Sequence, residues 1–384
     1  MRYRKICDQP LLSLASLGLL ILAFVGVLPF LSMLPPHGST SSEDLYFGVD
    51  VAYGDVAATK LLIDRVSPYT NLFVIGCLGS YNESRLDDIT QYVYDKGLYF
   101  IIYSDSYRYP SKNWFEKASS KYGNRLLGVY YFDEVGGKVL DQSNGPIIRS
   151  AANYTEAAQK FVSVLSGLIR GNLSVTSSFA SPDQYKLFTS DYAFYWFDYQ
   201  AGYDVVLAQL GWNNSRQLNM ALCRGAATAF GKEWGVIITW TYRQAPYIES
   251  GPELYDDLVL AYENGAKYIL IFDSNEDYSA SILREEHFEA MQRFWQYFKD
   301  NPRTGVPIGE RVAYVLPKDY AYGFRGEGDR IWGLWGPDSI TAEMCDNVSL
   351  MLENYGTRLD LLYPGTVQAL ESLGYNEIFF WSEG

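Results

Sequence analysis

Two adjacent carboxylates, Asp133 and Glu134, end the apolar run LLGVYYFDE and are followed by Gly136 and Gly137. An apolar run of this kind is typical of a buried parallel strand that opens into a loop. Carboxylates can serve as general acid, general base or nucleophile. Because side chains alternate along a strand, we expect one of the pair to point into a barrel while its neighbour supports it from the side.

Other polar and aromatic residues lie at or just beyond the ends of further apolar runs. Catalytic residues of strand-helix barrels collect at the carboxyl ends of the strands, so these residues are candidates for the same site. We predict Asp273 as the second reacting carboxylate, because an apolar run ends on it directly. An Asp at such a junction also caps the following helix in many proteins, and that alternative stays open for each Asp. The predicted substrate contacts are Asp50, Tyr53, Asp105, Gln209, Trp212, Trp240 and Tyr242.

These residues belong to eight repeated strand-then-helix units. The predicted strands are 46–51, 71–77, 98–104, 126–134, 173–179, 203–210, 234–240 and 267–273. The predicted helices are 55–66, 84–96, 111–122, 153–170, 182–190, 214–230, 252–264 and 284–300. The aromatic segment 191–200 is predicted to be an extra strand or a loop that closes the mouth. Eight such units predict a (β/α)8 barrel over residues 46–304, a fold that takes about 250 residues.

The pattern changes after the barrel. Strands at 311–317, 358–364 and 377–381, with helices at 340–355 and 366–373, predict a small three-stranded α/β unit over residues 305–384 that packs against the barrel. The Gly- and Trp-rich loop 318–338 is either a lid over the site or an interface with the barrel. We favour the interface, because buried aromatic residues dominate interfaces.

The N-terminus predicts a membrane anchor. Residues 1–10 carry Arg2, Arg4 and Lys5, and residues 11–34 carry no charge. An apolar run of this length exceeds the ~20 residues that cross a bilayer and the ~7–15 residues of a signal-peptide core. We therefore expect an uncleaved single-pass anchor, with residues 1–10 in the cytoplasm, 35–45 as a linker, and the barrel outside.

Composition argues against several classes of function. A formal net charge of −14 and the absence of a Lys/Arg-dense segment argue against nucleic-acid binding. There are two His residues, His37 and His287, which argues against a histidine zinc site or a Ser/His/Asp triad. The four Cys residues are far apart and predict buried free thiols. We therefore expect no metal and no cofactor.

The segment GVYYFDEV (128–135) resembles the fourth-strand motif of the (β/α)8-barrel glycoside hydrolases of the large retaining clan, where an Asn-Glu pair ends strand four. The resemblance implies that Glu134 is the acid/base and that Asp133 replaces the Asn that holds the sugar's 2-hydroxyl group. It also implies a Glu nucleophile after strand seven. This chain has GVIITWTYRQ there, and its next acid is Glu249.

These features predict a membrane-anchored, extracytoplasmic protein that hydrolyses a glycosidic bond in a glycan through paired carboxylates. The alternative is a non-catalytic glycan-binding or cell-envelope protein on the same barrel, which the missing Glu of strand seven favours.

Overall fold

The computed structural model describes residues 45–76, 82–104, 110–141, 147–176, 185–211, 214–238, 249–303, 305–326, 328–365 and 367–381. The predicted membrane span at 11–34 lies outside these ranges. Within them, no helix combines the length and the apolar character that crossing a membrane requires.

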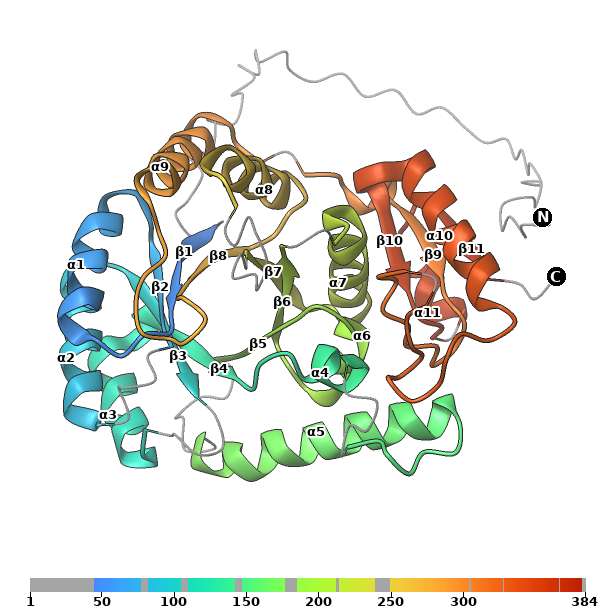
Figure 1. Ribbon diagram of the computed structural model, residues 1–384, viewed down its shortest axis with the longest axis horizontal. Coiled ribbons are helices and arrows are strands. Elements are labelled where there is room, and N and C mark those ends of the chain that lie inside the picture. The colour runs from blue at the N-terminus through green and yellow to red at the C-terminus, as the bar shows by residue number, and fades with distance from the viewer. Residues whose placement is uncertain are drawn as a thin grey trace, which may run out of the picture.

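Eight parallel strands close into a barrel in sequence order, with the first strand paired to the eighth. The strands are β1 (Tyr46–Val51), β2 (Leu72–Ile75), β3 (Tyr99–Ser104), β4 (Leu126–Tyr131), β5 (Lys186–Asp191), β6 (Val205–Leu210), β7 (Glu233–Ile238) and β8 (Tyr268–Asp273). The helices around them are α1 (Val56–Val66), α2 (Glu83–Asp95), α3 (Lys112–Tyr122), α4 (Val135–Asp141), α5 (Tyr154–Thr176), α6 (Tyr195–Ala201), α7 (Arg216–Phe230), α8 (Gly251–Glu263) and α9 (Glu285–Asp300). The predicted (β/α)8 barrel is confirmed (Figure 1).

Strand side chains alternate between the inside of the barrel and the layer beneath the helices. Val74, Ile101, Leu207 and Leu270 belong to the apolar cluster that fills the inside. Their neighbours along the strands pack in a second cluster under the helices. Because both faces of each strand are buried, the strands are almost continuous apolar runs, which is why they are visible in the sequence.

The fifth unit differs from its prediction. Residues 173–176 complete α5, so the predicted strand at 173–179 is wrong, and the strand of this unit is β5. The predicted helix at 182–190 is therefore also wrong. Residues 191–200 form neither an extra strand nor only a loop, because α6 begins at Tyr195. The intrinsic strand propensity of the sequence gives the wrong prediction here, because residues 186–191 form a strand through pairing with β4 and β6.

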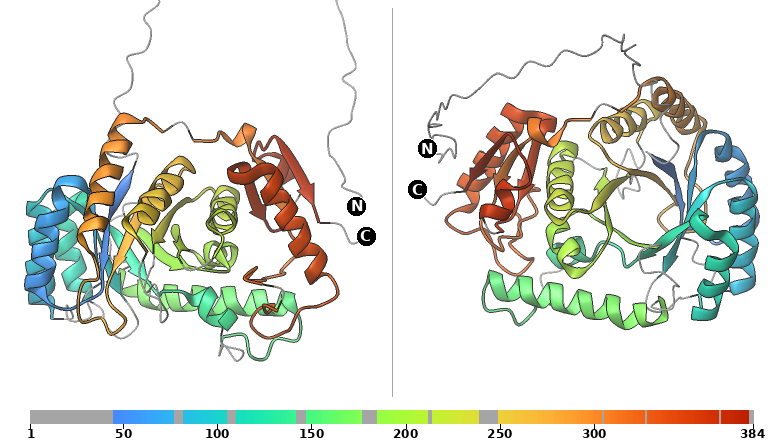
Figure 2. Two further views of the ribbon diagram at one scale, coloured as in Figure 1. Left: turned by 45° about the horizontal axis from the view of Figure 1, so that its top comes forward. Right: turned by 180° about the vertical axis from the view of Figure 1, so that it is seen from behind.

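The C-terminal unit is confirmed as a three-stranded parallel sheet in the order β10-β9-β11. It contains β9 (Val312–Val315), α10 (Thr341–Tyr355), β10 (Leu359–Leu362), α11 (Val367–Glu371) and β11 (Glu377–Phe380). Both views in Figure 2 place it beside α7.

Loop 318–338 joins the C-terminal unit to the barrel. Trp332 is fully buried, and its ring lies 4.9 Å from the Phe194 ring and 4.6 Å from the Phe197 ring, between centroids. The interface predicted for this loop is therefore confirmed at Trp332. The loop also packs on α4, where a Cβ atom added to Gly333 would lie 2.1 Å from the Val139 carbonyl oxygen.

A buried ion pair also joins the two parts. Asp360 of β10 is fully buried, and its Oδ1 atom lies 2.7 Å from Nε of Arg224 on α7. Its Oδ2 atom accepts hydrogen bonds from Arg311 Nη1 at 2.8 Å and from the Tyr375 hydroxyl at 2.7 Å. Both carboxylate oxygens are therefore satisfied at the boundary between barrel and C-terminal unit.

We predict that Asp360→Asn lowers the free energy of unfolding by about 3–5 kcal/mol, because it leaves a buried arginine without its counter-charge. Urea unfolding followed by tryptophan fluorescence measures the change. Asp88→Asn is the control, since Asp88 pairs with Lys60 at a half-exposed position, and such pairs contribute about 0–1 kcal/mol. Equal effects of the two substitutions would contradict the prediction.

Candidate active site

The inward-facing positions become polar at the carboxyl ends of the strands. On β5 and β6, Phe188 and Leu207 belong to the apolar cluster inside the barrel. Two residues later on the same faces stand Ser190 and Gln209, and Asp50 ends the inward row of β1. The mouth of the barrel therefore has a polar floor above an apolar interior.

Asp133 and Glu134 lie in one hydrogen-bond network on this floor. Asp133 Oδ1 accepts bonds from the Tyr130 hydroxyl and from Ser190 Oγ, both at 2.7 Å. Gln209 Nε2 donates to Ser190 Oγ at 3.0 Å and to Glu134 Oε1 at 2.7 Å. The structure thus brings together three of the predicted site residues, Asp133, Glu134 and Gln209. We expected only one of the two carboxylates to point into the barrel, whereas both belong to this network.

The surroundings of Glu134 favour its protonated form. Burial raises the pKa of Glu134, and the charge of Asp133 raises it further, while Lys138 and Gln209 lower it. Lys138 Nζ lies 3.4 Å from Glu134 Oε2, and the Glu134 side chain is 29% exposed. Burial also raises the pKa of Asp50 well above its usual range, with Asp133 adding to the effect. The mouth therefore holds a partly exposed carboxyl, that of Glu134, whose pKa is raised.

The backbone is strained where the loops leave the strands. Phe132 and Glu134 have φ angles of 50° and 58°, Phe194 has 59° and Tyr278 has 56°. A residue with a side chain in this left-handed region costs of order 1–3 kcal/mol, and such residues concentrate at functional sites. Here they lie in three loops that follow β4, β5 and β8.

Asp273 and Tyr53 lie on the other side of the barrel wall. Tyr268 and Leu270 face inward on β8, so Asp273 faces outward, and it is fully buried. Asp273 Oδ1 accepts bonds from Ser281 Oγ at 3.0 Å and from the Ile282 amide at 2.8 Å, and the Tyr53 hydroxyl donates to Oδ2 at 3.3 Å. This position suits a residue that anchors the β8–α9 loop better than one that reacts with a ligand.

Four predicted contacts, Asp105, Trp212, Trp240 and Tyr242, lie outside the described residues. In the described part of the chain, no group of three or more His, Cys, Asp or Glu residues is arranged to hold a metal ion.

Tyr278, an exposed aromatic residue near the acid pair, is a candidate that the sequence pattern did not predict. Its side chain is 47% exposed, and burial of the rest together with the charges of Asp133 and Glu134 raises its pKa. Asn275 shapes the loop around it, because Asn275 Oδ1 accepts the amides of Ser279 and Ala280 at 2.8 and 3.1 Å, and its carbonyl oxygen accepts the Tyr278 amide at 3.1 Å. A single Tyr among small polar residues, in SNEDYSAS, was the available signal.

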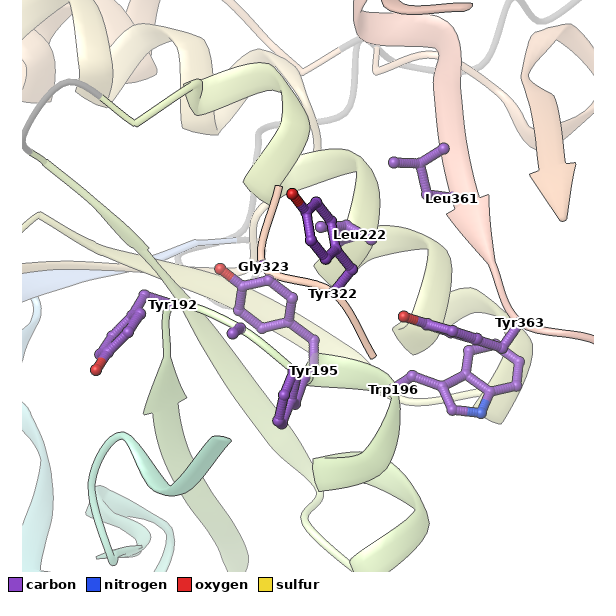
Figure 3. Close-up of a pocket in the computed structure, with 10 residues that line it drawn as sticks. Tyr192, Tyr195, Trp196, Leu222, Tyr322, Gly323, Leu361 and Tyr363 are labelled. Atoms are coloured by element: carbon purple, nitrogen blue, oxygen red, sulfur yellow. The ribbon is translucent and has the colours of Figure 1, made fainter. Parts of the chain in front are cut away.

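A small hollow lies next to the mouth, between α6 and the C-terminal unit. Its lining includes Tyr195, Trp196 and Tyr363, which are packed side chains of the interface (Figure 3). Tyr192 stands apart from Trp196 and Tyr363 in this view, and its hydroxyl donates to Asp141 Oδ2 at 2.6 Å. The hollow therefore belongs to the junction of the two parts, and Tyr192 links that junction to α4.

No protein-family model matches the chain, and no curated protein matches its sequence. Its fold is similar to α-L-fucosidase isoenzyme 2 from Paenibacillus thiaminolyticus, with a TM-score of 0.50 and 10% identity over 83% of this chain and 58% of that chain. It is also similar to the catalytic module of a family 98 glycoside hydrolase from Streptococcus pneumoniae TIGR4, with a TM-score of 0.50 and 10% identity over 89% and 66% of the two chains. The chain thus spans less than two thirds of either structure. At this identity the likeness shows the fold alone, a (β/α)8 barrel.

Proposed function

We propose that the chain hydrolyses a glycosidic bond in a glycan that binds across the mouth of the barrel. The observation that carries the proposal is the state of Glu134. It is a partly exposed carboxyl whose pKa is raised by burial and by Asp133, and Gln209 orients it at the end of a barrel strand. A carboxyl whose pKa is raised in this way is suited to general acid catalysis.

In the proposed reaction, Glu134 donates its proton to the glycosidic oxygen while the bond to the sugar carbon breaks. Asp133 is the second carboxylate, oriented by Tyr130 and Ser190, and it takes one proton from the attacking water. One proton is given and one is taken, so the step balances, and exchange with solvent restores both groups. Asp273 anchors the β8–α9 loop in this mechanism and does not react.

The remaining groups at the mouth would hold the sugar. The exposed ring of Tyr278 offers an apolar face beside the acid pair, and sugar rings stack on such faces. Asp50 and Gln209 present hydrogen-bonding groups on the same floor. Hydrogen-bonding groups beside an exposed aromatic ring are the features that protein sites use to bind carbohydrates.

A second candidate is glycan binding without cleavage. The chain that follows β7, TWTYRQ, contains no carboxylate, although the clan that it resembles has its nucleophile there. The same groups would then bind the glycan, and no bond would break.

We predict that Glu134→Gln lowers kcat/KM by about 10²–10⁴-fold on a polysaccharide, because the amide has no acidic proton to give. A substrate whose leaving group needs no protonation, such as a dinitrophenyl glycoside, should recover part of this loss. In the wild-type chain, kcat/KM should fall as pH rises through the raised pKa of Glu134, since only the protonated form is the acid.

The matched control is Glu343→Gln, an exposed glutamate on α10 far from the mouth. Unchanged turnover in Glu134→Gln would remove Glu134 from the mechanism. Wild-type binding without turnover, across a panel of aryl glycosides and envelope polysaccharides, would establish the second candidate instead.

We predict that Tyr278→Ala weakens glycan binding about 5- to 10-fold, because the stacking face beside the acid pair is lost. Calorimetric titration measures the affinity whether or not the glycan is cleaved. Tyr94→Ala on α2 is the control, since Tyr94 is similarly exposed, at 39%. Equal affinity in wild type and Tyr278→Ala would show that Tyr278 does not touch the glycan.

We also infer that residues 11–34 anchor the chain, with the barrel outside the membrane. The charge-free run and the cations before it support this arrangement. The chain should stay with membranes in alkaline carbonate, and protease added to intact cells should reach the barrel. Release of the full-length chain by carbonate would contradict the anchor.

A further inference from the structure

The backbone of Glu134 is tied to β5. Its amide donates to the Ser190 carbonyl oxygen at 2.9 Å, and its own carbonyl oxygen accepts the Lys138 amide at 2.9 Å. Glu134 is therefore the residue from which α4 starts, and it makes this start with a left-handed φ of 58°. Contacts with neighbouring residues must stabilise this left-handed backbone of Glu134, because the conformation is costly for a residue with a side chain.

Asp191, the last residue of β5, is placed to do so. It is fully buried, and its Oδ2 atom accepts the Gly136 amide at 2.6 Å. Its Oδ1 atom accepts the amides of Gly137 at 2.7 Å, Tyr192 at 2.8 Å and Ala193 at 3.1 Å. Burial raises the pKa of Asp191 to about 7, while the amides of Ala193, Gly136 and Gly137 lower it, because these hydrogen bonds favour the charged carboxylate. One carboxylate thus ties the first turn of α4 to the turn that follows β5.

The glycine pair after Glu134 makes this contact possible. A Cβ atom at Gly136 would lie 2.9 Å from Asp191 Oδ2 and 2.7 Å from Phe194 Cβ. A Cβ atom at Gly137 would lie 2.1 Å from the Tyr192 ring. Any side chain at these two positions would push the β5–α6 turn away from α4, so the short GG sequence and the carboxylate act together.

We propose that Asp191 is the positioning residue of this site: through the first amides of α4 it holds Glu134 in the strained backbone that presents its carboxyl to the mouth. The inference rests on the proposed function and goes beyond it, since it names the residue that sets the geometry of the acid. Asp191 does not touch the substrate, because its side chain is buried behind the barrel wall.

The test is Asp191→Asn in the full-length chain. Asparagine keeps the shape but replaces one acceptor oxygen with an NH₂ group that faces a backbone N–H. We expect kcat to fall at least about tenfold while KM stays within about twofold, because the acid is misplaced and the sugar contacts are not.

Asp198→Asn is the matched control: Asp198 of α6 is equally buried, at 1% exposure, but neither of its carboxylate oxygens has a hydrogen-bond partner in the described part of the chain. Its kcat should match that of wild type.

A second readout does not depend on turnover. Carbodiimide reacts with protonated carboxyls, so labelling of Glu134 against pH, followed by mass spectrometry, reports the pKa of that group. Burial raises this pKa, so a Glu134 that has come loose into water should label with a midpoint at lower pH in Asp191→Asn than in wild type. Because the charges of Asp191 and Glu134 also interact directly, Gly137→Ala, which displaces the same turn and keeps the Asp191 carboxylate, should show the same shift. If the wild-type chain cleaves no glycan, the proposed function fails, and the labelling midpoint alone decides the positioning role.

Thermal unfolding checks that each variant is folded. If Asp191→Asn does not fold, Asp191→Ser, which is smaller and keeps one acceptor oxygen, replaces it. Wild-type kcat together with an unchanged Glu134 midpoint would overturn the proposal. So would an equal loss in Asp198→Asn, because the effect would then belong to any buried carboxyl in this region.

Discussion

In a closed barrel whose strands are buried on both faces, inward-facing polar groups must bond to one another, and here they stand at the last inward positions of the strands. Lower in the barrel, an unpaired polar side chain would cost several kcal/mol. At the mouth, Gln209 donates directly to Ser190, and the charge of Asp133 raises the pKa of Asp50. This constraint gathers the polar groups of distant segments into one site, and the rest of the candidate chemistry depends on it.

The acid pair enters the site in a different way. β4 ends at Tyr131, and the chain leaves it with left-handed φ angles at Phe132 and Glu134. Because of this turn, the side chains of Asp133 and Glu134 do not alternate between the two faces as strand residues do. Both can therefore join the hydrogen-bond network of Ser190 and Gln209. The conformation is fixed before any ligand arrives, which is the kind of preorganisation that catalysis by positioned charges requires.

Much of the fold could be predicted because strands buried on both faces are readable as apolar runs. The fifth strand is hard to predict because KLFTSD carries polar residues at both ends, whereas the segment 173–179 has a better strand pattern although its residues 173–176 continue α5. The left-handed turn could not be predicted, since glycine is its usual signal and here Phe and Glu adopt it. The place of Asp273 at a strand end could be predicted, but its side of the barrel wall could not, because only the structure shows that Tyr268, Leu270 and Phe272 form the inward row.

Loop 318–338 belongs to the C-terminal unit in sequence, yet it packs on α4, the helix that begins directly after Glu134. Gly333 lies against the Val139 carbonyl, and Arg325 Nη1 lies 2.5 Å from Asp141 Oδ1 at the far end of that helix. The C-terminal unit thus supports α4, the helix that begins directly after Glu134. Recombination near residue 305 that joined this C-terminal unit to another barrel would break the contacts between loop 318–338 and α4. We therefore expect the barrel and the C-terminal unit to be inherited together and to mutate in a correlated way.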